Sequence, residues 1–348
     1  MKVLLLNNYS MRSALSRVRN GAYPPQHLYG HGDARPVSQR QTTWLPVGVS
    51  LFDVVRGSGR GWRALRAVVM RTIGDPLQEL AVLTNRKRID VVFAADQWSA
   101  GGLLALKRLG MSLPPIMVLV HHPPQSSQQL RRLTAAERLV VLGPAAAEAL
   151  ERATGIRPRT LPWGPDPEAD VYRRARDPEA APRYDFVAAG RTNRDYTALR
   201  ELAAADGLTG VVFDGILRWD FVDGTVQQQP QSEDYREILV EMARARCVVM
   251  PFAREDVMSG LTEATDAMAL DIPILATRSS AFPYDLEATR SGVVAGRNSV
   301  AGLRAGLAEL ETVSRRAGRL LATHDLGQYE AALDSELVAV VRTAAVRA

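Results

Sequence analysis

The sequence predicts an α/β protein with two doubly wound, Rossmann-like domains facing a central cleft. Short apolar runs alternate with amphipathic helical patterns along all 348 residues. The runs are continuous rather than alternating in polarity, as in strands covered on both faces. A chain of this length is long for one domain and comfortable for two. Strand–helix–strand repetition then indicates parallel sheets with right-handed crossovers.

The expected strands form two sets, separated by a segment without periodicity. The first set covers 3–6, 90–95, 116–120 and 138–142, with helical patterns at 100–110 and 144–155. The second set covers 185–190, 210–214, 247–252, 272–277 and 292–296, and an amphipathic pattern over 329–346 ends the chain.

The segment 157–185 between the two sets is rich in proline and charge, which is typical of a linker. We therefore expect an N-terminal domain over 1–164 and a C-terminal domain over 165–326. A final helix over 327–348 is expected to pack back on the N-terminal domain. Ligands of such sheets bind at the carboxyl ends of the strands, so a cleft between the domains is the expected site.

Composition narrows the class of protein. The one cysteine, Cys247, lies in the apolar run CVVMPF and reads as a core thiol in a reducing compartment, so we expect a cytoplasmic protein. The apolar start VLLL is too short for a signal peptide or a membrane span. The net charge is +5, but no basic run is interleaved with aromatic residues, so nucleic-acid binding is not expected.

One predicted helix has an unusual start, in the stretch EDVMSGLTEATDAMALDIPIL (255–275). Ser259 is a good N-cap, Gly260 lets a ligand approach the backbone, and a helix start attracts anions. Helical spacing places one polar side at Ser259, Thr262, Glu263 and Asp266, and a core side at Leu261, Ala264, Thr265 and Met268. The pattern therefore predicts either a phosphate site, with an acid one turn away for a ribose, or a capped surface helix.

Two further strand ends carry chemistry. In DFVAAGRTNRDY the strand is followed by Gly190, Arg191 and Arg194, and two guanidinium groups there could neutralise a diphosphate. In IMVLVHHPP, His121 ends a strand and could donate to a sugar hydroxyl or phosphate. The alternative for the loop with Arg191 and Arg194 is an ordinary surface loop, and the alternative for His121 is a histidine bonded to backbone in the core. No histidine–cysteine set or Asp-x-Asp pair suggests a metal, and no cofactor is expected.

These motifs together resemble retaining glycosyltransferases of the GT-B fold, in the large family-four group that uses nucleoside diphosphate-sugar donors. The resemblance covers nearly the whole chain. It is carried by DVVFAAD, IMVLVHHP, the inter-domain TLPWGPD, the loop GRTNRDYTAL and the helix SGLTEATDAMALDIPILAT. It implies metal-independent transfer with retention, a C-terminal domain that binds the donor and an N-terminal domain that binds the acceptor.

The resemblance also implies roles for single residues. Arg191 would contact the diphosphate, with Arg194 in place of the family's lysine, and His121 would lie near the donor sugar. The family's ribose-binding acid precedes Ala-Met-Ala, which is Asp266 here; Glu263 remains its rival. The family's earlier acid corresponds to Met258, as in a branch with Ser-Gly after that position. Asp271 replaces a glycine and is expected to take the left-handed cap.

Two segments leave other readings open. The loop 20–36 has the glycine, proline and aromatic content of an acceptor-covering loop, or of any surface loop. The helical pattern 59–71 could touch an anionic membrane, although a solvated face is the stronger interpretation. The expected function is a glycosyltransferase; the alternatives are a sugar-nucleotide epimerase, a phosphorylase or a non-catalytic sugar-nucleotide binder.

Overall fold

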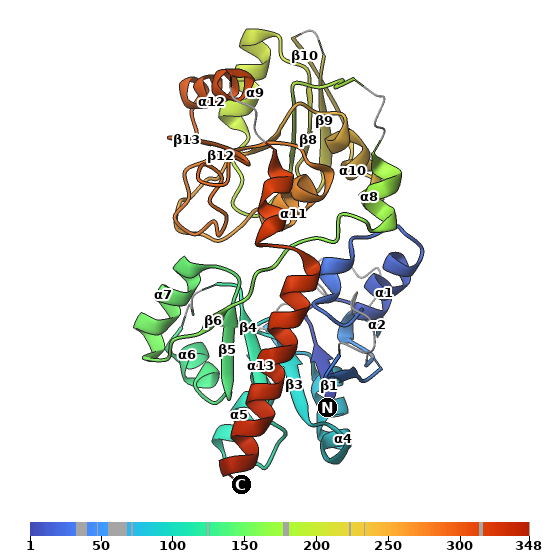
Figure 1. The fold of residues 1–348 in the computed structure, drawn as a ribbon, viewed down its shortest axis with the longest axis vertical. Helices are drawn as coiled ribbons and strands as arrows, with labels where there is room; N and C mark the ends of the chain where they lie inside the picture. The colour runs from blue at the N-terminus through green and yellow to red at the C-terminus, as the bar shows by residue number, and fades with distance from the viewer. Residues whose placement is uncertain are drawn as a thin grey trace. The chain divides into compact units, whose positions relative to one another are not determined.

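A computed structural model describes residues 1–32, 40–46, 48–54, 68–70, 72–122, 124, 126–176, 181–222, 224–232, 234–312 and 316–347. It divides the chain into two compact units (Figure 1). The N-terminal unit consists of Met1–Arg17, His27–Trp163 and Leu326–Ala348. The C-terminal unit consists of Val18–Gln26 and Gly164–Asp325.

The N-terminal unit is built on a six-stranded parallel sheet of order β2-β1-β3-β4-β5-β6. Its strands are β1 (Lys2–Leu6), β2 (Thr43–Trp44), β3 (Val91–Ala94), β4 (Ile116–Val120), β5 (Arg138–Val141) and β6 (Arg159–Thr160). Its helices include α1 (Met11–Arg19), α2 (Leu51–Val54), α4 (Pro76–Asn85), α5 (Gly101–Arg108), α6 (Ser127–Leu133) and α7 (Pro144–Thr154). All residues of β3 and β4 are buried, which confirms the expectation of strands covered on both faces.

The long final helix α13 (Leu326–Arg347) packs against β3 and β4 of the same unit (Figure 1). Its buried side chains Tyr329, Leu333, Leu337 and Val340 recur at helical spacing. Glu336 on the same helix forms ion pairs with Arg138 and Arg159, at 3.3 and 3.6 Å. The amphipathic pattern at the end of the sequence is thus used to cover the sheet of the N-terminal unit.

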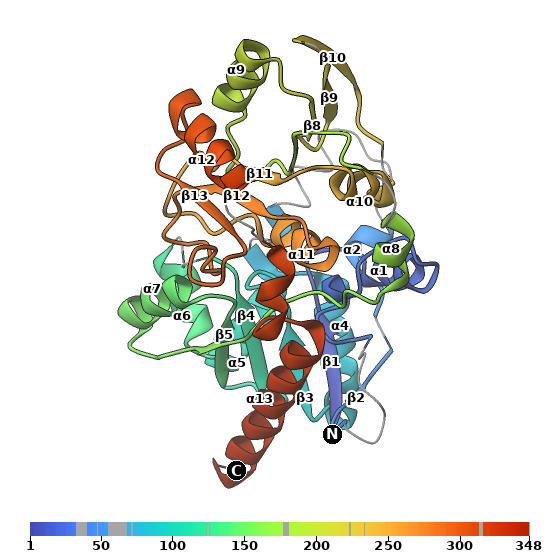
Figure 2. The same ribbon diagram turned by 45° about the horizontal axis from the view of Figure 1, so that its top comes forward.

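The C-terminal unit has a seven-stranded sheet of order β10-β9-β8-β7-β11-β12-β13. Its strands are β7 (Phe186–Ala189), β8 (Gly210–Phe213), β9 (Leu217–Val222), β10 (Thr225–Pro230), β11 (Val248–Met250), β12 (Ile274–Thr277) and β13 (Gly292–Ala295). Its helices include α8 (Asp170–Ala175), α9 (Thr197–Asp206), α10 (Tyr235–Ala243), α11 (Leu261–Leu270) and α12 (Val300–Thr312). The predicted strands pair in parallel, and the antiparallel β9 and β10, which were not predicted, extend one edge (Figure 2).

The predicted linker glycine Gly164 has a packing reason. A Cβ atom at this position would overlap the backbone carbonyl of His324. The chain enters the C-terminal unit at Gly164 and leaves it after Asp325, so these two passages lie directly against each other. Only a residue without a side chain permits that approach.

The sequence did not indicate that Val18–Gln26 belongs to the C-terminal unit. Within that unit, the ring of Tyr23 meets the ring of Tyr235 edge-on, with centroids 5.2 Å apart. The buried Gln26 donates from Nε2 to the hydroxyl of Tyr172 at 2.6 Å and to Oγ1 of Thr265 at 3.3 Å. The first part of the expected acceptor loop therefore packs onto the C-terminal unit, and its residues 33–36 lie outside the described residues.

Two other expectations concern membranes and the thiol. Among the described residues, no helix combines the length and the apolar character that crossing a bilayer requires. The helical pattern 59–71 falls outside the described residues apart from 68–70. Cys247 is a buried free thiol, and burial raises its pKa to about 12, as expected for a core residue.

Candidate functional site

The sheet order of the C-terminal unit locates a switch point between β7 and β11. From β7 the chain continues to β8 on one side, and it later returns to β11 on the other side. In open α/β sheets, the crevice at such a point, outside the carboxyl ends of the strands, is where ligands bind. The loops 190–196 and 251–260 follow β7 and β11 and meet there.

Asn193 joins these two loops. It adopts φ 55°, a left-handed conformation that asparagine tolerates better than most residues. Its Nδ2 donates to the carbonyls of Arg254 and Val257 at 2.9 and 3.2 Å and to Oγ of Ser259 at 3.2 Å. Its Oδ1 accepts from the amide of Arg254 at 2.9 Å. Sequence reasoning missed this residue, whose only signal is an asparagine in a tight turn.

Arg194 lies beneath the site rather than on its surface. Its side chain is 1% exposed, and its guanidinium carbon is 4.9 Å from the centroid of the Phe252 ring. Nη1 donates to Oγ of Ser259 at 3.3 Å, and Nη2 is 3.4 Å from Oε1 of Glu263. Arg194 therefore fixes the position of a hydroxyl and a carboxylate, and its charge is already partly compensated by Glu263.

Glu263 and Gly190 are in direct contact. Gly190 adopts φ 97°, and a Cβ atom there would overlap Oε1 of Glu263. The side chain of Glu263 is 13% exposed. The carboxylate is thus held between the backbone at the end of β7 and the guanidinium of Arg194. Glycine is required here for its conformation and for the space that the carboxylate occupies.

The start of α11 differs from the expectation in one respect. Gly260, with φ 82°, is the N-cap, and no side chain caps the helix, whereas Ser259 was expected to do so. The Oγ of Ser259 is instead bonded to Asn193 and Arg194. The first amides of a helix have no intrahelical acceptor, so this uncapped start keeps N–H groups and the positive dipole end for an anion.

Asp266 does not share the polar side of Glu263, which corrects the helical-wheel expectation. It is 1% exposed. Its Oδ1 accepts a 2.7 Å hydrogen bond from the hydroxyl of Tyr172, and its Oδ2 accepts one from Tyr235. Burial raises the pKa of this carboxyl to about 7, although the two tyrosine hydrogen bonds oppose that shift. Of these two acids, Glu263 is the one whose side chain is partly exposed.

The remaining predicted residues of this unit lie around the same point. Arg191 is exposed just beyond β7, and the alkyl part of its side chain lies against Gly215. Leu261 and Thr262 occupy the first turn of α11 and are half-buried. Arg191 is thus placed to meet an anion from solvent, whereas Arg194 is not.

His121 lies in the N-terminal unit, directly after β4. Its Nε2 is 2.9 Å from the carbonyl of Ala95. A carbonyl only accepts, so Nε2 is the donor in this contact. The side chain of Gln97 holds the segment in place, since its Oε1 accepts from the amides of His121 and His122 at 2.8 and 3.0 Å. Gln97 had not been singled out from the sequence.

No cluster of three or more histidine, cysteine, aspartate or glutamate side chains suited to a metal ion occurs within the described ranges. The charged side chains at the switch point include Arg191, Arg194 and Glu263, beside the helix start.

Comparisons with known proteins identify the fold. No family model matches the chain, and no curated protein matches it. Among solved structures, sucrose-phosphate synthase of Thermosynechococcus elongatus is similar over 99% of this chain and 100% of its own, with 13% identity and a TM-score of 0.60. The lipopolysaccharide outer core galactosyltransferase WaaB in its apo form is similar over 97% and 99%, with 11% identity and a TM-score of 0.52.

HepE of Anabaena, solved in complex with UDP and glucose, is similar over 100% of this chain and 99% of its own, with 12% identity and a TM-score of 0.51. At these identities the likeness concerns the fold. The chain has the GT-B fold of nucleotide-sugar glycosyltransferases, with two Rossmann-like domains.

Proposed function

We propose that the protein is a glycosyltransferase that moves a sugar from a nucleoside diphosphate-sugar donor to an acceptor. The observation that carries the proposal is the placement of Glu263. Its carboxylate is held against Gly190 by Arg194, 3.4 Å away, at the switch point of a Rossmann-like sheet. A fixed and partly exposed carboxylate beside a helix start suits a ligand that carries hydroxyls and phosphates together.

The proposed role of each residue follows from its exposure to solvent. Arg191 and the first amides of α11, at Leu261 and Thr262, meet the diphosphate and stabilise the charge that develops as it departs. Glu263 accepts hydrogen bonds from hydroxyls of the ribose or the sugar. Arg194 and Ser259 act from beneath, by positioning Glu263 and the turn before α11. This division transfers to Glu263 the role that the resemblance implied for Asp266.

Three parts of the proposal rest on the resemblance alone. These are retention of the anomeric configuration, independence from metals and the action of His121 on the donor sugar. In a retaining mechanism, the departing phosphate can take the proton of the acceptor hydroxyl. No general base in addition to Glu263 is then needed.

The donor site is tested by thermal shift with UDP, GDP and ADP and with their glucose conjugates. Wild type is compared with Glu263→Gln and Asp266→Asn. We expect at least one nucleotide to raise the Tm of wild type. Glu263→Gln should lose most of that increase. Asp266→Asn should keep the increase, although its Tm without nucleotide should differ from that of wild type. The reverse pattern would return the role to Asp266. A wild type that no nucleotide stabilises would overturn the proposal.

The reaction itself is separated from its alternatives by product analysis. A glycosyltransferase consumes the donor only when an acceptor is present. An epimerase converts the donor alone, a phosphorylase requires inorganic phosphate, and a non-catalytic binder is stabilised by the donor and turns nothing over. Each of these three results would replace transfer as the assigned function.

A further inference from the structure

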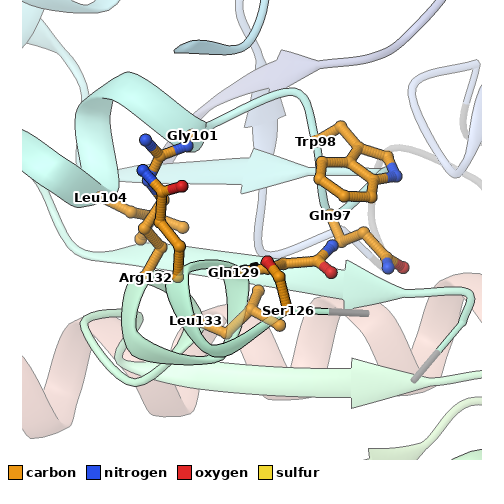
Figure 3. Close-up of a pocket in the computed structure, with 9 residues that line it drawn as sticks. Gln97, Trp98, Gly101, Leu104, Ser126, Gln129, Arg132 and Leu133 are labelled. Atoms are coloured by element: carbon orange, nitrogen blue, oxygen red, sulfur yellow. Dashed lines mark hydrogen bonds between the residues drawn. The ribbon is translucent and has the colours of Figure 1, made fainter. Parts of the chain in front are cut away.

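The pocket of the N-terminal unit between α5 and α6 is too small for a ligand. Its cavity measures about 30 Å³, which is room for about two water molecules. Trp98 and Arg132 lie at opposite sides of it in Figure 3, and Arg132 also lies beside the carboxyl of Glu79. The C-terminal unit offers a clearer binding feature, which is the outer edge of its sheet.

The strand β10 (Thr225–Pro230) forms that edge. It is the outermost strand in Figure 2, and among the described strands it pairs only with β9. All six of its residues are exposed. Natural sheets protect open edges with charged side chains, bulges, prolines or a covering element. The run TVQQQP carries no charge and its register with β9 is continuous, so within the strand only the terminal proline protects this edge.

The register with β9 shows which backbone groups of β10 point outward. The amide of Gln231 donates to the carbonyl of Ile216 at 3.0 Å. In an antiparallel ladder, residues 225, 227 and 229 therefore also bond to β9. The residues between them face the open side: Val226 and Gln228 with an N–H and a C=O each, and Pro230 with a C=O alone. A proline fits this position because no N–H is needed there.

The apolar exposure of the C-terminal unit is concentrated at the same hairpin. Among the described residues of this unit, the exposed large apolar side chains are Ile216, Val222 and Val226. Val226 belongs to β10, Val222 ends β9 beside it, and Ile216 directly precedes β9. Exposed apolar side chains that gather at one place mark an interaction surface. The edge thus combines outward backbone groups with apolar side chains.

We propose that β10 pairs with β10 of a second copy of this chain, in antiparallel orientation about a two-fold axis at Gln227. Val226 then lies opposite Gln228 of the second copy, and such a pair forms two hydrogen bonds. The axis repeats the pair, so every outward N–H and C=O of these two residues is used. An axis at Gln228 would instead place the ring of Pro230 opposite the carbonyl of Val226, which would lose its donor.

The strand suits a second copy of itself because it is neutral. Self-pairing of the run 225–230 brings no like charges opposite each other. The two Val226 side chains become diagonal neighbours on one face of the joined sheet, where they share apolar surface. Two-fold dimers are also the commonest oligomers. One pair of short strands is small beside stable interfaces of roughly 1,200 Å² or more, so the dimer should be weak, with a Kd in the micromolar range.

Cysteine substitutions in the full chain test the register. In Gln227→Cys the two thiols face each other across the axis, as a non-hydrogen-bonded pair with Cα atoms about 4.5 Å apart, which a disulfide can span. In the matched control Gln229→Cys, on the same face, the two Cα atoms lie roughly 13 Å apart along the strands, which is too far. Under mild oxidation, Gln227→Cys should form a disulfide dimer at least tenfold faster on non-reducing gels. Cys247, the one native cysteine, is buried.

Sedimentation velocity tests the backbone hydrogen bonds. The weight-average sedimentation coefficient of wild type should rise with protein concentration towards that of a dimer. Gln228→Pro removes an outward N–H from each copy and leaves the ladder to β9 in place, so it should abolish the rise. The control Gln228→Ala keeps that N–H and should rise as wild type does.

The dimer is overturned if wild type stays a monomer up to submillimolar concentration, or if Gln228→Ala loses the rise as Gln228→Pro does. It is equally overturned if the two cysteine variants crosslink at the same rate or if neither crosslinks. These readouts do not depend on the donor site. A dimer in a protein that no nucleotide stabilises would remove only the transferase proposal, and nucleotide binding by a monomer would remove only the dimer.

Discussion

The hydroxyl of Tyr172 donates a 2.7 Å hydrogen bond to Oδ1 of Asp266, and Tyr235 donates to the other oxygen. This buried carboxylate therefore joins α8, α10 and α11. Gln26 extends the network, since its amide donates to Tyr172 at 2.6 Å. A segment from the first 26 residues is thus fastened to the helix that begins at the candidate donor site. In this structure both carboxylate oxygens of Asp266 are bonded to protein hydroxyls, and the residue is 1% exposed.

Burial of Asp266 predicts a pH dependence of stability. Its pKa is raised from 3.8 to about 7 in the folded state, so the folded state holds the proton more tightly than the unfolded state. The stabilisation from that proton is fully present below about pH 4 and is lost as pH rises towards 7. At about 1.4 kcal/mol per pKa unit, the free energy of unfolding should fall by about 3 kcal/mol between pH 5 and 8.

The measurement is urea unfolding of the full chain labelled with 5-fluorotryptophan, at pH 5 and pH 8. The fluorine resonance of Trp219 reports the unfolding of the C-terminal unit. Asp266→Asn cannot titrate and should remove most of the difference between the two values. The control is Glu79→Gln in the N-terminal unit, where burial raises the pKa of Glu79 to about 7. That change should leave the Trp219 transition as in wild type. If the free energy of unfolding of Asp266→Asn fell between pH 5 and pH 8 as much as that of wild type, groups other than Asp266 would be responsible for the pH dependence.

Adding a methyl group at Gly190 should displace Glu263. The Cβ atom of Gly190→Ala would overlap Oε1 of that carboxylate, and the backbone at φ 97° would be strained as well. We expect nucleotide affinity to fall at least tenfold by calorimetry. Gly207→Ala is the control, because Gly207 has φ 64° and open space where the Cβ would lie. It should cost about 1 kcal/mol of stability and leave the affinity unchanged. Equal losses in both variants would mean that backbone strain alone is responsible.

The hydrogen bonds of Asn193 should be needed to keep the two site loops together. Asn193→Ala removes its side-chain bonds to Arg254, Val257 and Ser259 and places alanine at φ 55°. The free energy of unfolding should fall by about 2–4 kcal/mol, and nucleotide affinity should fall with it. Asn193→Gly relieves the backbone but loses the same bonds, so it should recover stability and leave affinity low. An Asn193→Gly variant that binds as wild type does would contradict this role.

The elements that the sequence predicted are those with continuous apolar runs. Residues 116–120 and 274–277 form fully buried parallel strands, because such runs need cover on both faces. Asp271 takes the left-handed cap as expected, with φ 58°. The antiparallel strands over 217–222 and 225–230 were missed, although their sequence offers the turn dipeptide Asp223-Gly224. The exposed residues of the second strand left no apolar run to detect.

The site was harder to predict, because its arrangement depends on residues far apart in the chain. Helical spacing placed Asp266 beside Glu263, but Tyr172 lies 94 positions from Asp266 and turns that carboxylate inward. Likewise, the pair of arginines after β7 was recognised, but nothing local shows that Phe252 and Glu263 bury Arg194. Local patterns located the strand ends and the helix start; they could not assign each charge to the surface or the interior.

Removal of divalent metals should leave transfer unaffected, because the proposed site compensates the diphosphate with Arg191 and the start of α11. In an assay of donor consumption with acceptor, we expect the rate in excess EDTA to stay within twofold of the untreated rate. Arg191→Ala should lower kcat at least tenfold, and added Mg²⁺ should not restore it. Arg304→Ala is the control, since Arg304 is a surface arginine of the same unit, paired with Asp206 at 2.7 Å. Loss of transfer in EDTA that Mg²⁺ restores would instead assign part of the compensation to a metal ion.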